Sequence, residues 1–131
     1  MVLVDTNIII DYWKAPDDKM TDFFEKEDIA ICGVVEAELI HGAPSEKEIG
    51  KILDAISCFE NLPFSGDWVR LGRMLNKLRK SGITVPFTDA IIAQTAIEYD
   101  VNLLTNDHHF ALINSVIPEL HLYATEKYNL E

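Results

Sequence analysis

Short apolar runs alternate with longer amphipathic segments along the whole chain. Val2–Val4 and Ile29–Cys32 are apolar at consecutive positions, and Val101–Leu104 is apolar except at Asn102; such runs are typical of strands buried on both faces of a parallel sheet. Leu120–Tyr123 predicts a last strand, and residues 62–64 form a connector or an edge strand. The segments between them show helical spacing of apolar residues, which predicts helices at residues 7–13, about 19–27, 34–41, after Ser45, about 67–80 and 89–99.

Several of these helices have recognisable starts. Ser45, with Glu48 three residues later, forms a capping box. Thr88 is predicted to cap the helix that begins at Asp89, and this helix is apolar nearly all round, which predicts that it is buried. The long helix before it has an apolar stripe formed by Trp68, Leu71, Leu75 and Leu78.

The alternation of strands and helices predicts an α/β fold, namely a three-layer α/β/α sandwich with a mostly parallel sheet. The length of 131 residues suits a single domain over residues 1–131, since no linker, repeat or low-complexity tract interrupts the chain. In such sheets, sites form beyond the carboxyl ends of the strands, where the strand order reverses. Polar residues that directly follow a buried strand are therefore the first candidates for chemistry.

The charge balance restricts the functional classes. The chain has 11 basic and 22 acidic residues, a net charge of −11, which excludes a general phosphate-coating nucleic-acid binder. It does not exclude a nuclease whose metal ions supply positive charge. No apolar run is long enough to span a bilayer and no signal peptide is visible, so we expect a cytoplasmic protein. In that compartment Cys32 and Cys58 are expected to be buried, reduced thiols.

Four acidic residues stand at the ends of predicted elements: Asp5, Glu38, Asp89 and Asp107. Each has a structural alternative: Asp5 is a good helix cap, Asp89 suits the first turn of a helix, and Asp107 fits an Asn-Asp turn. Glu36 and Glu38 lie about 200° apart around their helix, so at most one of them faces inward. What favours a site is that Asp5 and Asp107 both follow the carboxyl ends of buried strands.

Converging carboxylates without basic partners repel one another unless a cation lies between them. Mg²⁺ and Mn²⁺ are hard cations that prefer oxygen ligands, so these acids predict a site for one of these ions. The histidines show no zinc-binding spacing. They are His41, His108, His109 and His121. The pair His108-His109 is interpreted as solvent-exposed loop residues, although it lies beside Asp107.

Three segments carry the most specific motifs: VDTNIIIDY at the N-terminus, VVEAELIHGA in the middle and PFTDAIIAQTAIEYDVNLLTNDHHF towards the end. In order and spacing, this set resembles PIN-domain proteins of the VapC toxin type over the whole chain. The resemblance implies a sheet of order 3-2-1-4-5, with strands 1 and 4 side by side at the switch point. It also implies that the metal ligands are Asp5, Glu38, Asp89 and Asp107, supported by the neighbouring polar residues Thr6, Asn7 and Thr105.

The resemblance implies a Mg²⁺-dependent endoribonuclease toxin, in which Mn²⁺ can substitute and the four acids are catalytic. It further implies a homodimer and a cognate antitoxin that lays an Arg or Lys into the carboxylate cluster. No membrane association is expected. Four of the basic residues lie within about 80° on the long helix. They are Arg70, Arg73, Lys77 and Lys80. This stripe either contacts the RNA backbone or is simply a solvent-exposed face.

Other functions fit the sequence less well or stay open. A phosphotransfer receiver or a haloacid-dehalogenase-like phosphatase also has an Asp after its first strand. The phosphatase pattern needs a second Asp where Asn7 stands, and the late Lys of either fold is missing near Asp107. A PIN-domain nuclease that processes RNA without being a toxin and a catalytically inactive PIN-like binding module remain as alternatives.

Overall fold

The sheet at the centre of the molecule consists of four short strands. The computed structural model describes residues 1–125 and 128. The strands are β1 (Val2–Val4), β2 (Ile29–Cys32), β3 (Glu60–Leu62) and β4 (Asn102–Leu104). They lie in the order β3-β2-β1-β4, and each pair of neighbours is parallel. The predicted α/β fold with a parallel sheet is thus confirmed.

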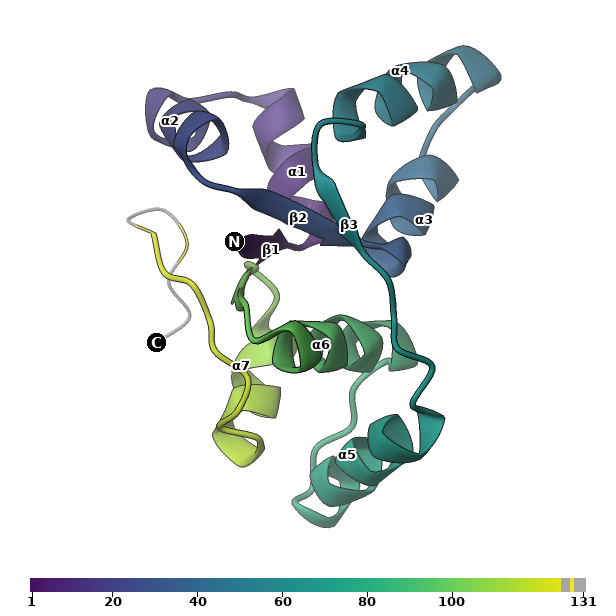
Figure 1. The fold of residues 1–131 in the computed structure, drawn as a ribbon, viewed down its shortest axis with the longest axis vertical. Coiled ribbons are helices and arrows are strands. Elements are labelled where there is room, and N and C mark those ends of the chain that lie inside the picture. Colours follow the sequence, from purple (N-terminus) through teal and green to yellow (C-terminus); the bar gives the residue numbers. More distant parts are fainter. Residues whose placement is uncertain (126–127, 129–131) are drawn as a thin grey trace.

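Helices cover both faces of the sheet, as Figure 1 shows. One face carries α1 (Thr6–Lys14), α2 (Asp18–Lys26), α3 (Gly33–His41) and α4 (Glu46–Ile56). The other carries α5 (Trp68–Lys80), α6 (Phe87–Tyr99) and α7 (His108–Val116). The division follows from the strand order, because the chain first moves from β1 to β3 in one direction and then returns past β1 to β4. Right-handed crossovers place the two sets of helices on opposite faces.

The strands are apolar on both faces because both faces are covered. β1 and β2 are buried at every position. On one side of the sheet α6 contributes the small buried side chains Ala90, Ala93 and Ala96, which allow close packing of this helix against its neighbours. The prediction that this helix is buried is confirmed for its central turns, whereas Phe87 and Tyr99 at its ends are exposed.

The predicted last strand at Leu120–Tyr123 is reduced to a single bridge. Leu122 pairs with Leu103 in parallel at the free edge of β4. The backbone N–H of Leu103 donates to His121 O at 2.9 Å, and that of Tyr123 donates to Leu103 O at 2.8 Å. The pairing stops there because β4 has only 3 residues. The fifth position of the expected order is therefore occupied by a bridged residue and not by a strand.

Two predictions about α5 and α6 are wrong in detail. Trp68 is 62% exposed, because it is the first residue of α5. Its ring packs edge-on against Phe64. Met74 is buried in its place, together with Leu71 and Leu78. α6 begins at Phe87, so Thr88 is not its cap; Pro86 occupies that position and makes no side-chain capping bond.

The Ser45 half of the predicted capping box of α4 is confirmed, whereas the Glu48 carboxylate accepts from Lys51 Nζ at 3.3 Å. The Ser45 hydroxyl accepts a hydrogen bond from Glu48 N at 3.3 Å.

One thiol prediction is wrong. Cys32 is buried, but Cys58 is exposed, and both are free thiols. Cys58 lies just beyond α4, and its Sγ donates to Ala55 O at 3.3 Å on the outer side of that helix.

Among the described helices, none combines the length and the apolar character required to cross a membrane.

The strand order reverses between β1 and β4, which are neighbours despite their separation along the chain. Leu3 pairs with Leu103, and Asp5 N donates to Leu104 O at 3.0 Å just beyond both strands. The chain leaves both strands at the same edge of the sheet. This edge brings Asp5 next to residues 105–107.

Candidate active site

Asp5 is a buried carboxylate at the switch point of the sheet. It is only 5% exposed, and it follows β1 directly. Its Oδ1 accepts from Thr6 N at 2.8 Å, so Asp5 does cap α1 as the structural alternative suggested. Its Oδ2 accepts from the Thr105 hydroxyl at 2.7 Å. Asp5 is therefore a helix cap and, at the same time, a member of a larger polar cluster.

Glu38, on α3, faces Asp5 across the first turn of α1. The Thr6 hydroxyl donates to Glu38 Oε1 at 3.2 Å, so Thr6 links both acids, through its backbone N–H and its side chain. Glu36 points elsewhere, because its Oε2 accepts from Asn61 Nδ2 at 3.0 Å. The choice between the two glutamates on α3 is settled in favour of Glu38 as the neighbour of Asp5.

Asp107 joins the cluster through the buried residue Thr105. The backbone N–H of Asp107 donates to the Thr105 hydroxyl at 2.9 Å, and the same hydroxyl donates to Asp5. Asp107 Oδ1 accepts from His109 N at 2.9 Å, which makes Asp107 the cap of α7. The segment after β4 is thus fixed by side chain to backbone bonds and is not a freely solvated turn.

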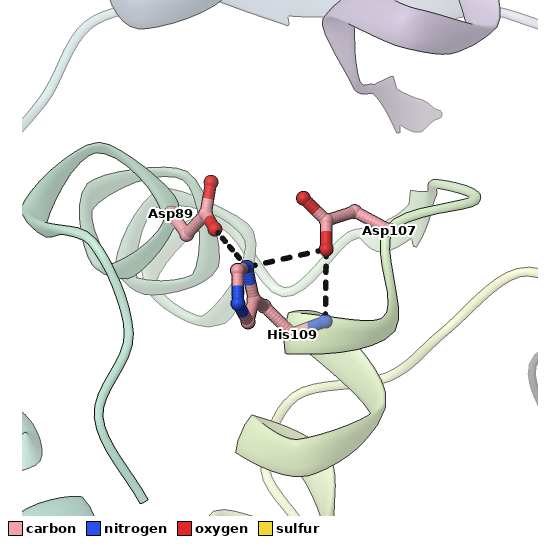
Figure 2. A group of neighbouring side chains, drawn as sticks. All are labelled: Asp89, Asp107 and His109. Atoms are coloured by element: carbon pink, nitrogen blue, oxygen red, sulfur yellow. Dashed lines mark hydrogen bonds and ion pairs between the residues drawn. The ribbon is translucent and has the colours of Figure 1, made fainter.

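Asp89 completes the set from the first turn of α6, and His109 lies between Asp89 and Asp107 (Figure 2). His109 Nδ1 is 3.0 Å from Asp89 Oδ2 and 3.3 Å from Asp107 Oδ1. The interpretation of His108-His109 as a loop pair is wrong, because α7 begins at His108 and turns the ring of His109 towards α6. His108 is exposed.

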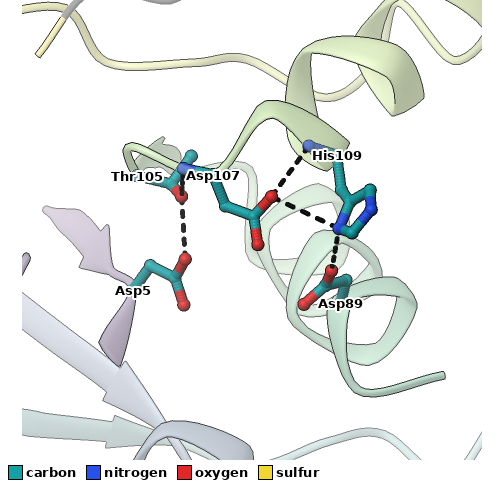
Figure 3. A network of polar contacts seen from close by, with 5 residues as sticks. All are labelled: Asp5, Asp89, Thr105, Asp107 and His109. Atoms are coloured by element: carbon teal, nitrogen blue, oxygen red, sulfur yellow. Dashed lines mark hydrogen bonds and ion pairs between the residues drawn. The ribbon is translucent and has the colours of Figure 1, made fainter. Parts of the chain in front are cut away.

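The four acids are connected by one continuous chain of polar contacts. Thr6 joins Glu38 to Asp5, Thr105 joins Asp5 to Asp107, and His109 joins Asp107 to Asp89. Figure 3 shows the carboxylates of Asp5, Asp89 and Asp107 turned towards a common space. Elements that are far apart in the sequence supply these groups, and only the strand order of the sheet brings them together.

Burial and mutual repulsion raise the pKa values of three of these carboxyls. The pKa of Asp89 is raised to about 6, chiefly by desolvation and also by the charges of Asp107 and Asp5, against the opposing effect of His109. Burial also raises the pKa of Asp5, although hydrogen bonds from Thr105 and Thr6 oppose the shift. The pKa of Glu38 is raised by desolvation and by the charges of Asp5 and Asp107. The site therefore concentrates carboxyl groups whose charges repel one another.

The side chains of the candidate site are suited to binding a divalent cation. Over residues 1–125 and 128, no Lys or Arg forms an ion pair with any of the four acids. Carboxylate oxygens are the ligands that Mg²⁺ and Mn²⁺ prefer. The ligand atoms of Asp89, Asp107 and His109 lie within 4.8 Å of one another, close enough to share one ion. Asp5 and Glu38 are not part of this tightest group.

The remaining residues predicted for the site lie apart from the acids or on the surface. Asn7 is exposed on α1 and, within the described part of the chain, makes no hydrogen bond to the four acids. The basic stripe consists of the exposed residues Arg70, Arg73, Lys77 and Lys80 on α5. Arg70 is 3.8 Å from Glu98 of α6, so part of its charge serves an ion pair within the protein.

His109 is the residue that the sequence analysis missed. The signal for it is its position two residues after Asp107, which puts it in the first turn of a helix capped by that acid. The sequence does not show that α7 packs beside α6, and this packing is what brings the imidazole to Asp89.

Comparisons with known proteins agree with this geometry. A family model described as PIN domain matches residues 2–115. A chain of the VapBC2 complex from Rickettsia felis, bound to a DNA fragment from its promoter, is 27% identical with a TM-score of 0.79, covering 94% of this chain and 98% of that one.

Two further solved structures share the fold at lower identity. VapBC-1 from nontypeable Haemophilus influenzae is 23% identical with a TM-score of 0.77, over 94% of this chain and 97% of that chain. FitAcB from Neisseria gonorrhoeae is 18% identical with a TM-score of 0.75, over 95% and 97%. A comparison with curated proteins finds no match. These findings confirm the resemblance inferred from the three motifs.

Proposed function

Because this chain belongs to the PIN-domain family, we propose that it is a metal-dependent endoribonuclease toxin that cleaves RNA and is held inactive by a cognate antitoxin. The observation that carries the proposal is the polar chain from Glu38 through Asp5 and Asp107 to Asp89. Four carboxylates without Lys or Arg partners are costly to bring together, and a bound Mg²⁺ or Mn²⁺ ion offsets that cost.

In this proposal Asp5, Glu38, Asp89 and Asp107 hold the ion. When bound there, a divalent ion lowers the pKa of a water molecule and neutralises charge on the scissile phosphodiester. The hydroxyls of Thr6 and Thr105 keep the carboxylates of Glu38 and Asp5 in fixed orientations. Hydrolysis by water leaves a 5′-phosphate and a 3′-hydroxyl on the cleaved RNA.

Cleavage of RNA by the purified protein tests the enzymatic part. We expect cleavage with Mg²⁺ or Mn²⁺ and none with EDTA, and a rate lower by orders of magnitude for Asp5→Asn, which keeps the shape but removes a charged ligand. Asp54→Asn, at an exposed position on α4, is the matched control and keeps full activity. Full activity in EDTA would contradict the metal mechanism, and mapping the RNA ends tests the chemistry.

An antitoxin partner is supported by the relatives and by the charge of the chain. The similar structures from Rickettsia felis and Haemophilus influenzae are VapBC complexes. A net charge of −11 and an acidic cluster favour a partner that presents Arg or Lys. An apolar hollow of about 390 Å³ between α1 and α4, with Trp13 and Ile52 in its lining, offers room for apolar side chains of that same partner.

The partner proposal has simple tests. A small gene for a DNA-binding protein directly upstream would favour a toxin over a nuclease that processes RNA alone. The homodimer stays a prediction, and sedimentation of the purified chain measures it. The proposal places the protein in the cytoplasm, where its RNA substrate is found. A catalytically inactive module would keep the fold but fail the cleavage test.

A further inference from the structure

His109 presents one ring nitrogen to two acids at once. Its Nδ1 lies 3.0 Å from Asp89 Oδ2 and 3.3 Å from Asp107 Oδ1, and the ring is 40% exposed (Figure 2). A single N–H on Nδ1 is directed at two acceptors in this arrangement. The ring nitrogen therefore lies beside two carboxylate oxygens. If those two oxygens bind a metal ion, Nδ1 is placed to be its third ligand.

The spacing of these atoms matches a metal coordination shell. Neighbouring ligands of an octahedral ion with bonds of about 2.1 Å lie about 3 Å apart. The two distances from Nδ1 are close to this value, and all three ligand atoms lie within 4.8 Å of one another. When the ring proton is on Nε2, Nδ1 offers its lone pair to an ion in place of an N–H to the two acids.

The first turn of α7 holds this arrangement in place. His109 N donates to Asp107 Oδ1 at 2.9 Å, so the backbone of His109 and the carboxylate of Asp107 are fixed to each other. Asp107 is in turn tied by its own N–H to the buried Thr105 hydroxyl. A ligand held by such contacts loses little conformational freedom when an ion binds.

A nitrogen ligand changes which ion the site favours. Mg²⁺ prefers oxygen ligands in near-ideal octahedral geometry, whereas imidazole suits first-row transition ions, whose affinities for such sites rise from Mn²⁺ upwards. We propose that His109 Nδ1 is a metal ligand beside Asp89 and Asp107, and that it makes the site bind first-row transition ions such as Mn²⁺ more tightly than Mg²⁺. This inference rests on the proposed function and goes beyond it in assigning a nitrogen ligand and a metal preference.

The test measures Mn²⁺ bound to the full chain, without RNA. Electron spin echo modulation detects a ¹⁴N nucleus that is directly bonded to Mn²⁺, and titration followed by the signal of free Mn²⁺ gives its Kd. We expect nitrogen coupling in the wild type and in His108→Gln, the exposed neighbour that serves as matched control. We expect the coupling to vanish in His109→Gln, together with a rise in the Mn²⁺ Kd of roughly tenfold or more.

Competition with Mg²⁺ measures the preference. His109→Gln should change the Mg²⁺ Kd much less than the Mn²⁺ Kd. His109→Asp, which replaces nitrogen by oxygen, should restore binding with a preference shifted towards Mg²⁺. Circular dichroism shows whether each variant is folded. If His109→Gln does not fold, His109→Asp still tests the proposal.

The outcomes separate this inference from the proposed function. If Mn²⁺ binds the wild type, binding is lost in Asp5→Asn or Asp89→Asn, and no nitrogen coupling is seen, His109 is not a ligand and only this inference falls. Equal losses of Mn²⁺ and Mg²⁺ affinity in His109→Gln would overturn the proposed preference. If the wild type binds neither ion, both this inference and the metal-dependent function are wrong.

Discussion

At the scale of single residues, one threonine hydroxyl connects two segments that are about a hundred positions apart. Thr105 is 2% exposed, donates to Asp5 Oδ2 at 2.7 Å and accepts from Asp107 N at 2.9 Å. Its oxygen thus satisfies a buried carboxylate and fixes the backbone of a second acid. In the proposed metal site, a residue of this kind would act on the ligands without touching the ion.

We predict that Thr105→Val lowers both stability and metal affinity. Valine has nearly the same shape but leaves Asp5 Oδ2 without its donor, which should cost about 1–3 kcal/mol of unfolding free energy. Because the Asp5 carboxylate loses an orienting bond, the Kd for Mn²⁺ should rise roughly 10-fold to 100-fold. Urea unfolding and Mn²⁺ titration measure the two effects.

Thr95→Val is the control for this prediction. Thr95 is fully buried, and its hydroxyl donates to Ile91 O at 2.7 Å within α6, about 9 Å along the helix from Asp89. This variant loses a buried hydroxyl of the same kind but should bind Mn²⁺ normally. An unchanged metal affinity in Thr105→Val would show that Thr105 has only a structural role.

The raised pKa of Asp89 predicts how stability depends on pH in metal-free protein. Its pKa is about 6 in the folded state, against 3.8 for an ordinary Asp, so the folded state holds this proton more tightly. The contribution stabilises the fold below pH 3.8 and is lost as pH rises through about 6. At neutral pH, metal-free Asp89→Asn should therefore be more stable than wild type, by about 1–3 kcal/mol.

Thermal unfolding from acidic to neutral pH, in EDTA, measures this difference. The gap between Asp89→Asn and wild type should close as pH falls towards 3.8, whereas Asp54→Asn should follow wild type throughout. With Mg²⁺ at ten times its Kd, wild type should gain about 1.4 kcal/mol and Asp89→Asn much less. If metal-free Asp89→Asn melts well below wild type, the carboxyl has a structural role instead.

At the scale of secondary structure, strands and helix starts could be predicted from the chain, and packing between helices could not. β2 has the predicted bounds because its four consecutive apolar residues are suited to burial on both faces of the sheet. Asp5 and Asp107 could be predicted as neighbours because each follows a strand at the same edge of the sheet. Their contacts depend on strand order, which the resemblance to PIN-domain proteins supplied.

Two of the wrong predictions concern residues at helix ends. Trp68 fits the apolar stripe of α5, but the pattern does not say where the covering surface stops, and the first turn of the helix lies beyond it. His109 looks like a polar loop residue, but α7 packs against α6 and directs its ring towards Asp89. In both cases the outcome depends on what packs beside the helix, and periodicity within one segment carries no information about it.

The basic stripe on α5 predicts an effect on RNA binding. Arg73 and Lys77 are exposed on this helix. Arg73→Glu/Lys77→Glu in an Asp5→Asn background, which prevents cleavage, should weaken RNA binding and flatten its salt dependence by about one unit of slope. Stability should change by less than about 0.5 kcal/mol per site.

Lys47→Glu/Lys51→Glu is the matched control for the stripe. Both lysines are exposed on α4, and the exchange alters the net charge by the same amount. Fluorescence anisotropy with labelled single-stranded RNA at several salt concentrations measures both pairs. Equal losses in both pairs would indicate a general charge effect, and unchanged binding in the first pair would make α5 a plain solvent-exposed face.

At the scale of the whole molecule, the net negative charge and the acidic candidate site both determine what the protein can bind. A chain of net charge −11 repels RNA at long range, so the proposed function requires that RNA binding rely on the metal ion and on local basic residues. The same charge favours association with a basic partner. Under the proposed function, the partner that covers the carboxylates is what restrains the nuclease.

This balance leads to a prediction for living cells. Expressed alone in a bacterium from an inducible promoter, the wild-type chain should arrest growth, because an uncovered site turns over RNA repeatedly. Asp5→Asn should accumulate to the same level and leave growth unaffected, since one ligand of the proposed ion is missing, whereas Asp54→Asn should arrest growth like wild type. Growth curves with immunoblots of the three proteins measure this. If cells expressing wild type grow normally although the purified protein cleaves RNA well, the chain is a nuclease with an ordinary processing role, and the excess of acid then serves solubility and not the capture of an antitoxin.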